Sequence, residues 1–207
     1  MFRHLVIAGV AALVSLAAPA QTFPSRPIHF LVPFSPGSGT DIVARAVGDT
    51  LARSLQQPVV IDNRPGAGGT IAAAQVARSD PDGYTVLVHS SGHALNPAIY
   101  PNLPYDTLRD LTGITPLAAM PNVLVVAPQR GWKTVADLVA EAKAKPGQLN
   151  YASAGVGSAT HMNAEKFRLQ AGIDAVHVPY KGTPEAMTEV ISQRIDFFFA
   201  PLSSALP

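Results

Sequence analysis

Short apolar runs alternate with helix-like segments along most of the chain, and few folds accommodate this alternation. Residues 28–34 (IHFLVPF) and 123–127 (VLVVA) are continuous apolar runs of the length expected for buried strands. After the first run, apolar residues recur every four positions and predict a helix with one buried face, formed by Val43, Val47, Leu51 and Leu55. Strands that alternate with helices are typical of parallel sheets, so we expect an α/β fold.

The same patterns predict the remaining elements. Further strands are expected at residues 59–62, 85–89, 150–153, 175–179 and 195–200. Further helices are expected from residue 70 to about 78, and over residues 134–145, 158–171 and 184–193. Thr134 and Asp137 approximate a capping box at the start of one of these helices. Residues 96–110 predict loops with short helical turns.

Composition excludes several classes of function. The chain of 207 residues contains no cysteine, and its 15 lysines and arginines nearly balance 14 acidic residues. Without cysteine there can be no disulfide, thiolate metal site, cysteine nucleophile or lipid-modified N-terminal cysteine. The balanced charge provides no basic stripe, so we expect no nucleic-acid partner. With 47% hydrophobic residues the chain is typical of a folded globular protein.

The N-terminus has the three-part order of a secretory signal peptide. Arg3 precedes an apolar run at residues 5–18, and Ala18-Pro19-Ala20 fits the small-x-small cleavage pattern. The run is shorter than the roughly 20 residues that span a bilayer. We therefore expect residues 1–20 to be removed and the protein to be exported, which in a Gram-negative cell means the periplasm.

Three loops rich in small residues connect a predicted strand to a predicted helix, at residues 35–41 (SPGSGTD), 64–70 (RPGAGGT) and 152–161 (ASAGVGSATH). The first N–H groups of a helix have no partner within the helix, and glycine lets an anion approach them. Open α/β sheets also bind ligands at the carboxyl ends of their strands. Each loop alone could simply be a tight turn. Three at corresponding positions favour a site for a carboxylate or a phosphate.

Enzyme motifs are incomplete. Gly155-Val156-Gly157 is followed by Thr160, where a dinucleotide fingerprint needs Gly or Ala, and no P-loop sequence occurs. The nearest match to a G-x-S-x-G elbow ends in Ser158-Ala159, so Ser158 is interpreted as a helix cap or a ligand donor. We expect no cofactor.

The remaining polar candidates have two interpretations each. His89 and His93 have the spacing of a metal pair, but on a strand and a loop they are not expected to face one another, so no metal is predicted. His161 either donates to a ligand or lies at the surface, and Lys181 either reaches an anion or is solvated. Asp41 is expected to cap a helix.

Six stretches of these loops carry a resemblance to a known family. They are VPFSPGSGTDIVAR at 32–45, NRPGAGGT at 63–70, PDGYT at 81–85, LPYD at 103–106, YASAGVGS at 151–158 followed by Thr160-His161, and HVPYKG at 177–182. Together they closely resemble the Bug family, the periplasmic substrate-binding receptors of tripartite tricarboxylate transporters. They occur in family order over nearly all of the chain after residue 20.

The resemblance implies a two-domain clamp, the Venus flytrap fold of periplasmic binding proteins, that closes on a small carboxylate. It implies parallel-rich sheets, with residues 21–122 in the first lobe and 123–207 in the second. Family members grip the carboxylate with backbone N–H groups, hydroxyls and water. The ligand-binding residues that the resemblance implies are Phe34, Gly37, Gly39, Thr40, Asp41, Ala67, Ser90 and Ser91 in the first lobe, and Ser153, Gly155, Gly157, Ser158, Thr160, His161, Tyr180 and Lys181 in the second.

The chain departs from the family pattern in two places. Ser38 stands where the family usually has a second glycine, and family members continue beyond the segment that resembles residues 204–207. On that comparison the second lobe is expected to be truncated at its C-terminus.

Two functions from different classes are compatible with the sequence. The first is a monomeric receptor without catalysis, which binds a di- or tricarboxylate, an acidic amino acid or an aromatic acid for transport or sensing. Its partners would be membrane transporter subunits or a sensor kinase. The alternative is an exported serine-dependent α/β hydrolase that uses Ser158 with His161 or His177.

Overall fold

A computed structural model of the protein describes residues 22–206, so the signal peptide expected at residues 1–20 lies outside the described residues. The strands are β1 (Ile28–Val32), β2 (Val59–Asn63), β3 (Thr85–Leu87), β4 (Asn122–Val126), β5 (Asn150–Ser153), β6 (Val176–Pro179) and β7 (Phe197–Pro201). The α-helices are α2 (Gly39–Leu55), α3 (Thr70–Ala77), α4 (Asn96–Ile99), α5 (Val135–Ala144), α6 (Ala159–Ala171), α7 (Thr183–Ile191) and α8 (Leu202–Ala205). Three short 3-10 helices are η1 (Ala67–Gly69), η2 (Ser91–Leu95) and η3 (Pro128–Arg130).

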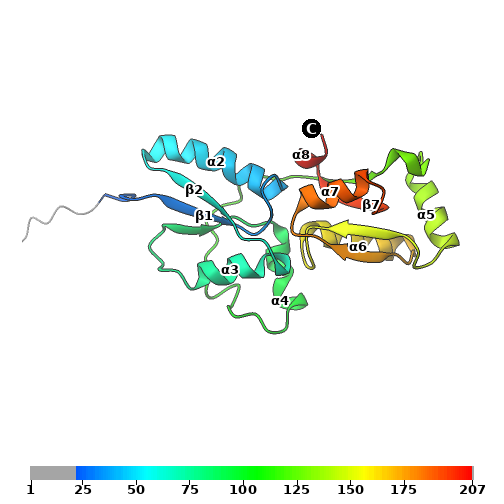
Figure 1. Cartoon of the computed structure of the whole chain (residues 1–207). Helices are drawn as coiled ribbons and strands as arrows, with labels where there is room; N and C mark the ends of the chain where they lie inside the picture. Colours follow the sequence, from blue (N-terminus) through cyan, green and yellow to red (C-terminus); the bar gives the residue numbers. More distant parts are fainter. Residues whose placement is uncertain (1–21, 207) are drawn as a thin grey trace, which may run out of the picture.

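The strands form two separate sheets, which lie at opposite ends of the molecule (Figure 1). The first has the order β2-β1-β3 and is entirely parallel. The second has the order β4-β7-β5-β6, in which only the pair of β4 with β7 is antiparallel. We call residues 22–121 the first lobe and residues 122–206 the second lobe. The expected parallel-rich sheets are confirmed.

Helix α2 covers one face of the first sheet and α3 the other (Figure 1). Alternate residues of β1, namely Ile28, Phe30 and Val32, pack against the apolar stripe of α2. That stripe contains Ala44, Val47, Leu51 and Leu55, as the four-residue spacing predicted for the last three. On the other face, Ala73 and Ala74 of α3 pack with Leu87 and Tyr105.

Strand β7 shows how the second sheet is buried on both faces. Phe197 and Phe199 pack into the cluster that contains Leu138 of α5. Phe198 and Ala200 point to the opposite face, where Ala186 and Val190 of α7 cover them. Because side chains alternate along a strand, the continuous apolar run at residues 197–200 packs against helices on both faces of the sheet.

The predicted elements are confirmed, with differences at their ends. Strand β1 ends at Val32 rather than residue 34, because Pro33 has no N–H to donate to a neighbouring strand. Strand β7 begins at Phe197 rather than residue 195, since Asp196 accepts a hydrogen bond from the N–H of Asn150 (2.7 Å). The capping box of α5 is present, with the Thr134 and Asp137 side chains each accepting the other's backbone N–H.

No helix within residues 22–206 is both long enough and apolar enough to span a membrane.

Candidate functional site

A pocket of about 510 Å³ lies between the two lobes. The first lobe contributes its wall from the start of η1 and from the residue that follows α4, as Gly66, Ala67, Gly68 and Tyr100. The second lobe contributes Ala154, Gly155, Val156, Pro179, Tyr180, Lys181 and Glu185, from the loops after β5 and β6 and the first turn of α7. Both contributing loops of the second lobe follow the carboxyl ends of parallel strands, where open α/β sheets bind ligands.

Direct contacts between the lobes surround this pocket. The Tyr100 hydroxyl donates to the carbonyl oxygen of Val156 (2.9 Å). A Cβ atom added to Gly68 would overlap that same carbonyl oxygen, so only glycine permits this approach of the two backbones. Gly92 of η2 similarly leaves no room for a side chain beside Gly157 and Ser158.

The N-terminus of α7 docks onto the loop that follows β1. The Ser38 hydroxyl accepts the N–H of Thr183 (3.1 Å), and the N–H of Ser35 is donated to the carbonyl of Lys181 (3.3 Å). The Ser35 hydroxyl donates to Oε1 of Glu185 (2.5 Å). Ser38, the residue that departs from the family pattern, is therefore a contact between the lobes in this structure.

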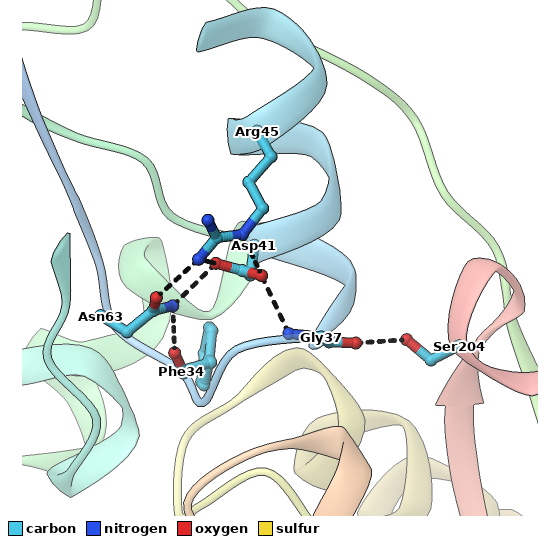
Figure 2. A network of polar contacts seen from close by, with 6 residues as sticks. All are labelled: Phe34, Gly37, Asp41, Arg45, Asn63 and Ser204. Carbon is cyan, nitrogen blue, oxygen red and sulfur yellow. Dashed lines mark hydrogen bonds and ion pairs between the residues drawn. The ribbon is translucent and has the colours of Figure 1, made fainter. Parts of the chain in front are cut away.

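Asp41 holds the loop after β1 in shape and is 1% exposed (Figure 2). Its carboxylate accepts the N–H of Gly37 (2.9 Å), two N–H groups of Arg45 (2.9 and 3.0 Å) and the side-chain amide of Asn63 (2.9 Å). Burial by itself would raise the pKa of Asp41, but these hydrogen bonds outweigh burial and lower the pKa below its usual value. The helix begins at Gly39 with Ser38 as its N-cap, so the expectation that Asp41 is the cap is wrong.

Replacing Asp41 should destabilise the protein. The Asp41→Ala variant leaves the Gly37 N–H and the Asn63 amide without their acceptor, and we expect a loss of about 2 kcal/mol in the free energy of unfolding, measured in urea. Asp49→Ala, an exposed position on the same helix, is the control and should change stability by less than about 0.5 kcal/mol. A loss below about 0.5 kcal/mol for Asp41→Ala would contradict this structural role.

The loop at residues 152–161 uses its own side chains to satisfy its N–H groups. The N–H of Ala154 is donated to the Thr160 hydroxyl (2.9 Å), and that of Gly157 to Nδ1 of His161 (3.2 Å). The N–H of Gly155 is donated to the Ser153 hydroxyl (3.0 Å). These groups are therefore engaged within the loop, which sequence reasoning about free helix N-termini did not anticipate.

The loop at residues 64–70 is different, because it presents free donors. Within residues 22–206, the N–H groups of Ala67 and Gly68 find no hydrogen-bond acceptor, and both residues line the pocket. Their backbone is left-handed, with φ of 45° and 59°. This is the loop whose geometry best fits an anion.

The serine and histidine geometry of a hydrolase is not present around Ser158. Ser158 is 1% exposed, and its hydroxyl caps α6 by accepting the N–H of His161 (3.2 Å). His177 bonds Ser153 instead (2.6 Å between Nε2 and Oγ), and Ser153 is fully buried. Burial and the neighbouring His161 lower the pKa of His177 to about 4. This pair supports the Gly155 loop through Ser153.

His89 and His93 lie in contact, with ring centroids 5.0 Å apart, so the expectation that their rings do not face one another is wrong. The cause is the 3-10 helix η2, which folds His93 back over the end of β3. No group of three potential metal ligands occurs within the part of the chain that the structure describes. Burial and the proximity of His93 lower the pKa of His89 to about 3.

The predicted site residues fall into two groups. Ala67, Gly155, Tyr180 and Lys181 line the pocket. The others build the surrounding loops or the contact between the lobes, and are Phe34, Gly37, Gly39, Thr40, Asp41, Ser90, Ser91, Ser153, Gly157, Ser158, Thr160 and His161. A ligand-binding role for any of them stays a prediction.

Sequence reasoning missed Tyr100 and Glu185. Tyr100 follows the short helix α4 in a stretch with weak periodicity. Glu185 lies in the first turn of α7, where acidic residues are common in any helix. Neither has a local sequence signal for a pocket, because each reaches it only through the packing of one lobe on the other.

Residues 43–207 match the family model described as the tripartite tricarboxylate transporter family receptor. The protein BugT of Bordetella pertussis is 40% identical over 196 residues, which cover 92% of this chain and 60% of BugT. The chain spans about 60% of the length of the curated relatives it matches.

Solved structures give the same result. MatC from Rhodopseudomonas palustris with bound malate is 33% identical and aligns with a TM-score of 0.85 over 89% of this chain and 63% of MatC. A second R. palustris protein, solved with adipate, is 34% identical and aligns with a TM-score of 0.82 over 89% of this chain and 62% of that protein. The expected α/β fold of a periplasmic binding protein is thereby confirmed. The chain belongs to the TctC/Bug family of tripartite tricarboxylate transporter receptors, which are binding proteins and not enzymes.

Proposed function

We propose that the two lobes are the two domains of a clamp, divided near Asn122, that closes in the periplasm on a small organic carboxylate. The observation that carries this proposal is the pocket of about 510 Å³, whose walls come from both lobes. Because a ligand in such a pocket contacts both lobes, its binding stabilises the closed arrangement.

The chemistry of the pocket suits an anion of modest charge. The N–H groups of Ala67 and Gly68 supply donors that need no positively charged side chain. Lys181 adds one cation to the wall, on the side of the second lobe. A carboxylate that lies between these groups would accept hydrogen bonds from the first lobe and interact with a charge from the second.

Two structural relatives support a carboxylate in particular. They were solved with malate and with adipate, both dicarboxylates. As for partners, we propose that the protein delivers the bound acid to membrane transporter subunits or signals its presence to a sensor kinase.

Thermal unfolding of the full-length protein against a panel of organic acids tests the proposal. The panel contains malate, adipate, citrate, the acidic amino acids and benzoate, each paired with the derivative in which every carboxylate is converted to an amide, as a control without the negative charge. A ligand at 100 times its dissociation constant should stabilise the folded state by about 2.7 kcal/mol, and its amide should not. A cooperative transition that no acid shifts would contradict the proposal.

A further inference from the structure

The imidazole of His161 holds the loop that forms one wall of the pocket. His161 lies in the first turn of α6, and its Nδ1 accepts the backbone N–H of Gly157 (3.2 Å). Because a peptide N–H can only donate, this Nδ1 carries no hydrogen, and the neutral imidazole has its hydrogen on Nε2. The bond therefore exists only while His161 is neutral.

The peptide that joins Val156 to Gly157 is also a contact between the lobes. Val156 lines the pocket, and its carbonyl oxygen accepts the Tyr100 hydroxyl of the first lobe (2.9 Å). The carbonyl of Val156 and the N–H of Gly157 belong to one planar peptide unit. His161 on one side and Tyr100 on the other therefore fix the orientation of the same group.

Protonation of His161 sets two donors against one another. The Nδ1–H of an imidazolium and the N–H of Gly157 both donate, so repulsion replaces their hydrogen bond. The peptide relieves this repulsion by rotating, and the glycine at position 157, with a φ of 80°, offers little resistance. Rotation turns the carbonyl of Val156 away from Tyr100, so the contact between the lobes is lost.

We propose that His161 is a positioning residue that makes ligand binding depend on pH: the neutral ring holds the Val156–Gly157 peptide against Tyr100, and the protonated ring releases it and weakens binding. This inference rests on the proposed function, because it assumes that the ligand binds with the lobes in contact. It applies to any bound acid, since His161 acts through the peptide and is not among the residues that line the pocket.

Two groups face the ring of His161 most closely. His177 of β6 stacks on it with ring centroids 4.1 Å apart. Glu165 lies one turn further along α6 and is held by Arg168 (2.9 Å) and by the Tyr151 hydroxyl of β5. Burial lowers the pKa of His161 and the charge of Glu165 raises it, with burial the larger effect, so the pKa lies below its ordinary value.

The other elements that pack against α6 add no carboxylate to this environment. The titratable residue of η2 is His93, whose ring stacks on that of Tyr105, and β7 carries no titratable residue. When the peptide rotates and the ring of His161 gains water, its pKa returns toward 6.5. Proton uptake and loss of the contact between the lobes therefore favour one another.

Calorimetric titration of the full-length protein at pH 7.5 and at pH 5 tests the inference, with malate and adipate as the first probes and the other acids of the panel after them. We expect the dissociation constant of the parent to rise about 5- to 30-fold at the lower pH, because binding must displace a proton from a group with a pKa of up to about 6.5. Carboxyl groups of the probe also titrate in this range, so each variant is compared with the parent at the same pH. Circular dichroism at pH 5 establishes that each protein is folded.

Two substitutions of His161 separate its proton from its hydrogen bond. In His161→Asn the side-chain oxygen takes the place of Nδ1 and accepts the N–H of Gly157, but the amide does not titrate. His161→Ala removes the acceptor and should bind about 5-fold more weakly than the parent at pH 7.5. We expect His161→Asn to restore most of this loss at pH 7.5 and to bind at least about 5-fold more tightly than the parent at pH 5.

His29→Asn is the matched control. His29 lies on β1 of the first lobe, where it pairs with Asp62 (3.0 Å), and it does not line the pocket. This variant should keep the parental dependence of affinity on pH.

The contrary outcomes are distinct. If His161→Asn loses affinity between pH 7.5 and pH 5 as steeply as the parent does, this inference is overturned while the proposed function stands. Unchanged affinity of His161→Ala at pH 7.5 would also overturn it, since the bond to Gly157 would then have no influence on binding. If no acid binds at either pH, the proposed function itself fails.

Discussion

The Gly182→Ala variant should bind its ligand about 10- to 100-fold more weakly than the parent protein. Gly182 is the N-cap of α7 and lies against the loop after β1 of the opposite lobe. An added Cβ would lie 2.7 Å from Cβ of Ser35, 2.9 Å from its backbone nitrogen and 2.6 Å from Oγ of Ser38. Backbone atoms cannot rotate away as a side-chain tip can, so the lobes must separate locally.

The substitution tests this contact without straining the backbone. Gly182 has a φ of −173°, an extended conformation that alanine adopts freely. Each lobe alone should therefore tolerate the methyl group. The cost of overpacking, about 1–3 kcal/mol, falls on the contact between the lobes and corresponds to the expected loss of affinity.

Calorimetry of the variant with the ligand found in the panel gives the affinity, and solution scattering at equal ligand concentration gives the separation of the lobes. Gly113→Ala is the matched control, because nothing lies within 4 Å of an added Cβ at that exposed loop position. Unchanged affinity in Gly182→Ala would show that the contact of α7 with the loop after β1 is absent from the bound state.

The elements of the fold could be predicted because their signals are local. The four-residue stripe of α2 and the apolar run of β7 each follow from spacing along one segment. Their exact ends depended on other segments. Strand β7 begins directly after Asp196, whose carboxylate accepts the N–H of Asn150. Asn150 belongs to β5 and lies 46 residues earlier in the chain.

The site was harder to predict, because side chains of the loops accept some of the backbone N–H groups and leave others free for a ligand. Three Gly loops at helix N-termini favoured one site for a carboxylate or a phosphate. In the loop at residues 152–161, Ser153, Thr160 and His161 accept the N–H groups that a ligand would otherwise use. The N–H groups of Ala67 and Gly68 in the pocket wall lack such an acceptor within residues 22–206. Residue type alone does not distinguish these outcomes.

Lowering the pH from 6.5 to 5 should markedly reduce the free energy of unfolding. The pKa of His177 is lowered to about 4 and that of His89 to about 3, in both cases chiefly by burial and further by a second histidine nearby. In the unfolded chain both return to a pKa near 6.5. Between these values the unfolded state binds more protons than the folded state, so stability is lost as the pH falls.

The expected slope is up to about 1.4 kcal/mol per pH unit for each of these histidines. The groups that face His177 decide whether it stays neutral. His161 stacks on it with ring centroids 4.1 Å apart and opposes a second charge, while Glu165, held by Arg168 and the Tyr151 hydroxyl, favours protonation. Burial outweighs Glu165, so the net shift of the pKa of His177 is downward.

Urea unfolding of the parent and of His177→Gln, measured at half-unit steps from pH 7.5 to 5, checks this prediction. At pH 7.5 the histidines are largely neutral in both states, so that end of the range serves as the internal control for their contribution. Glutamine can still bond the Ser153 hydroxyl but cannot titrate, so the variant should lose about 1.4 kcal/mol per pH unit of the parental slope. Equal slopes in the two proteins would mean that His177 is solvated in the folded state, and the stacked pair would then not be the buried support of the Gly155 loop.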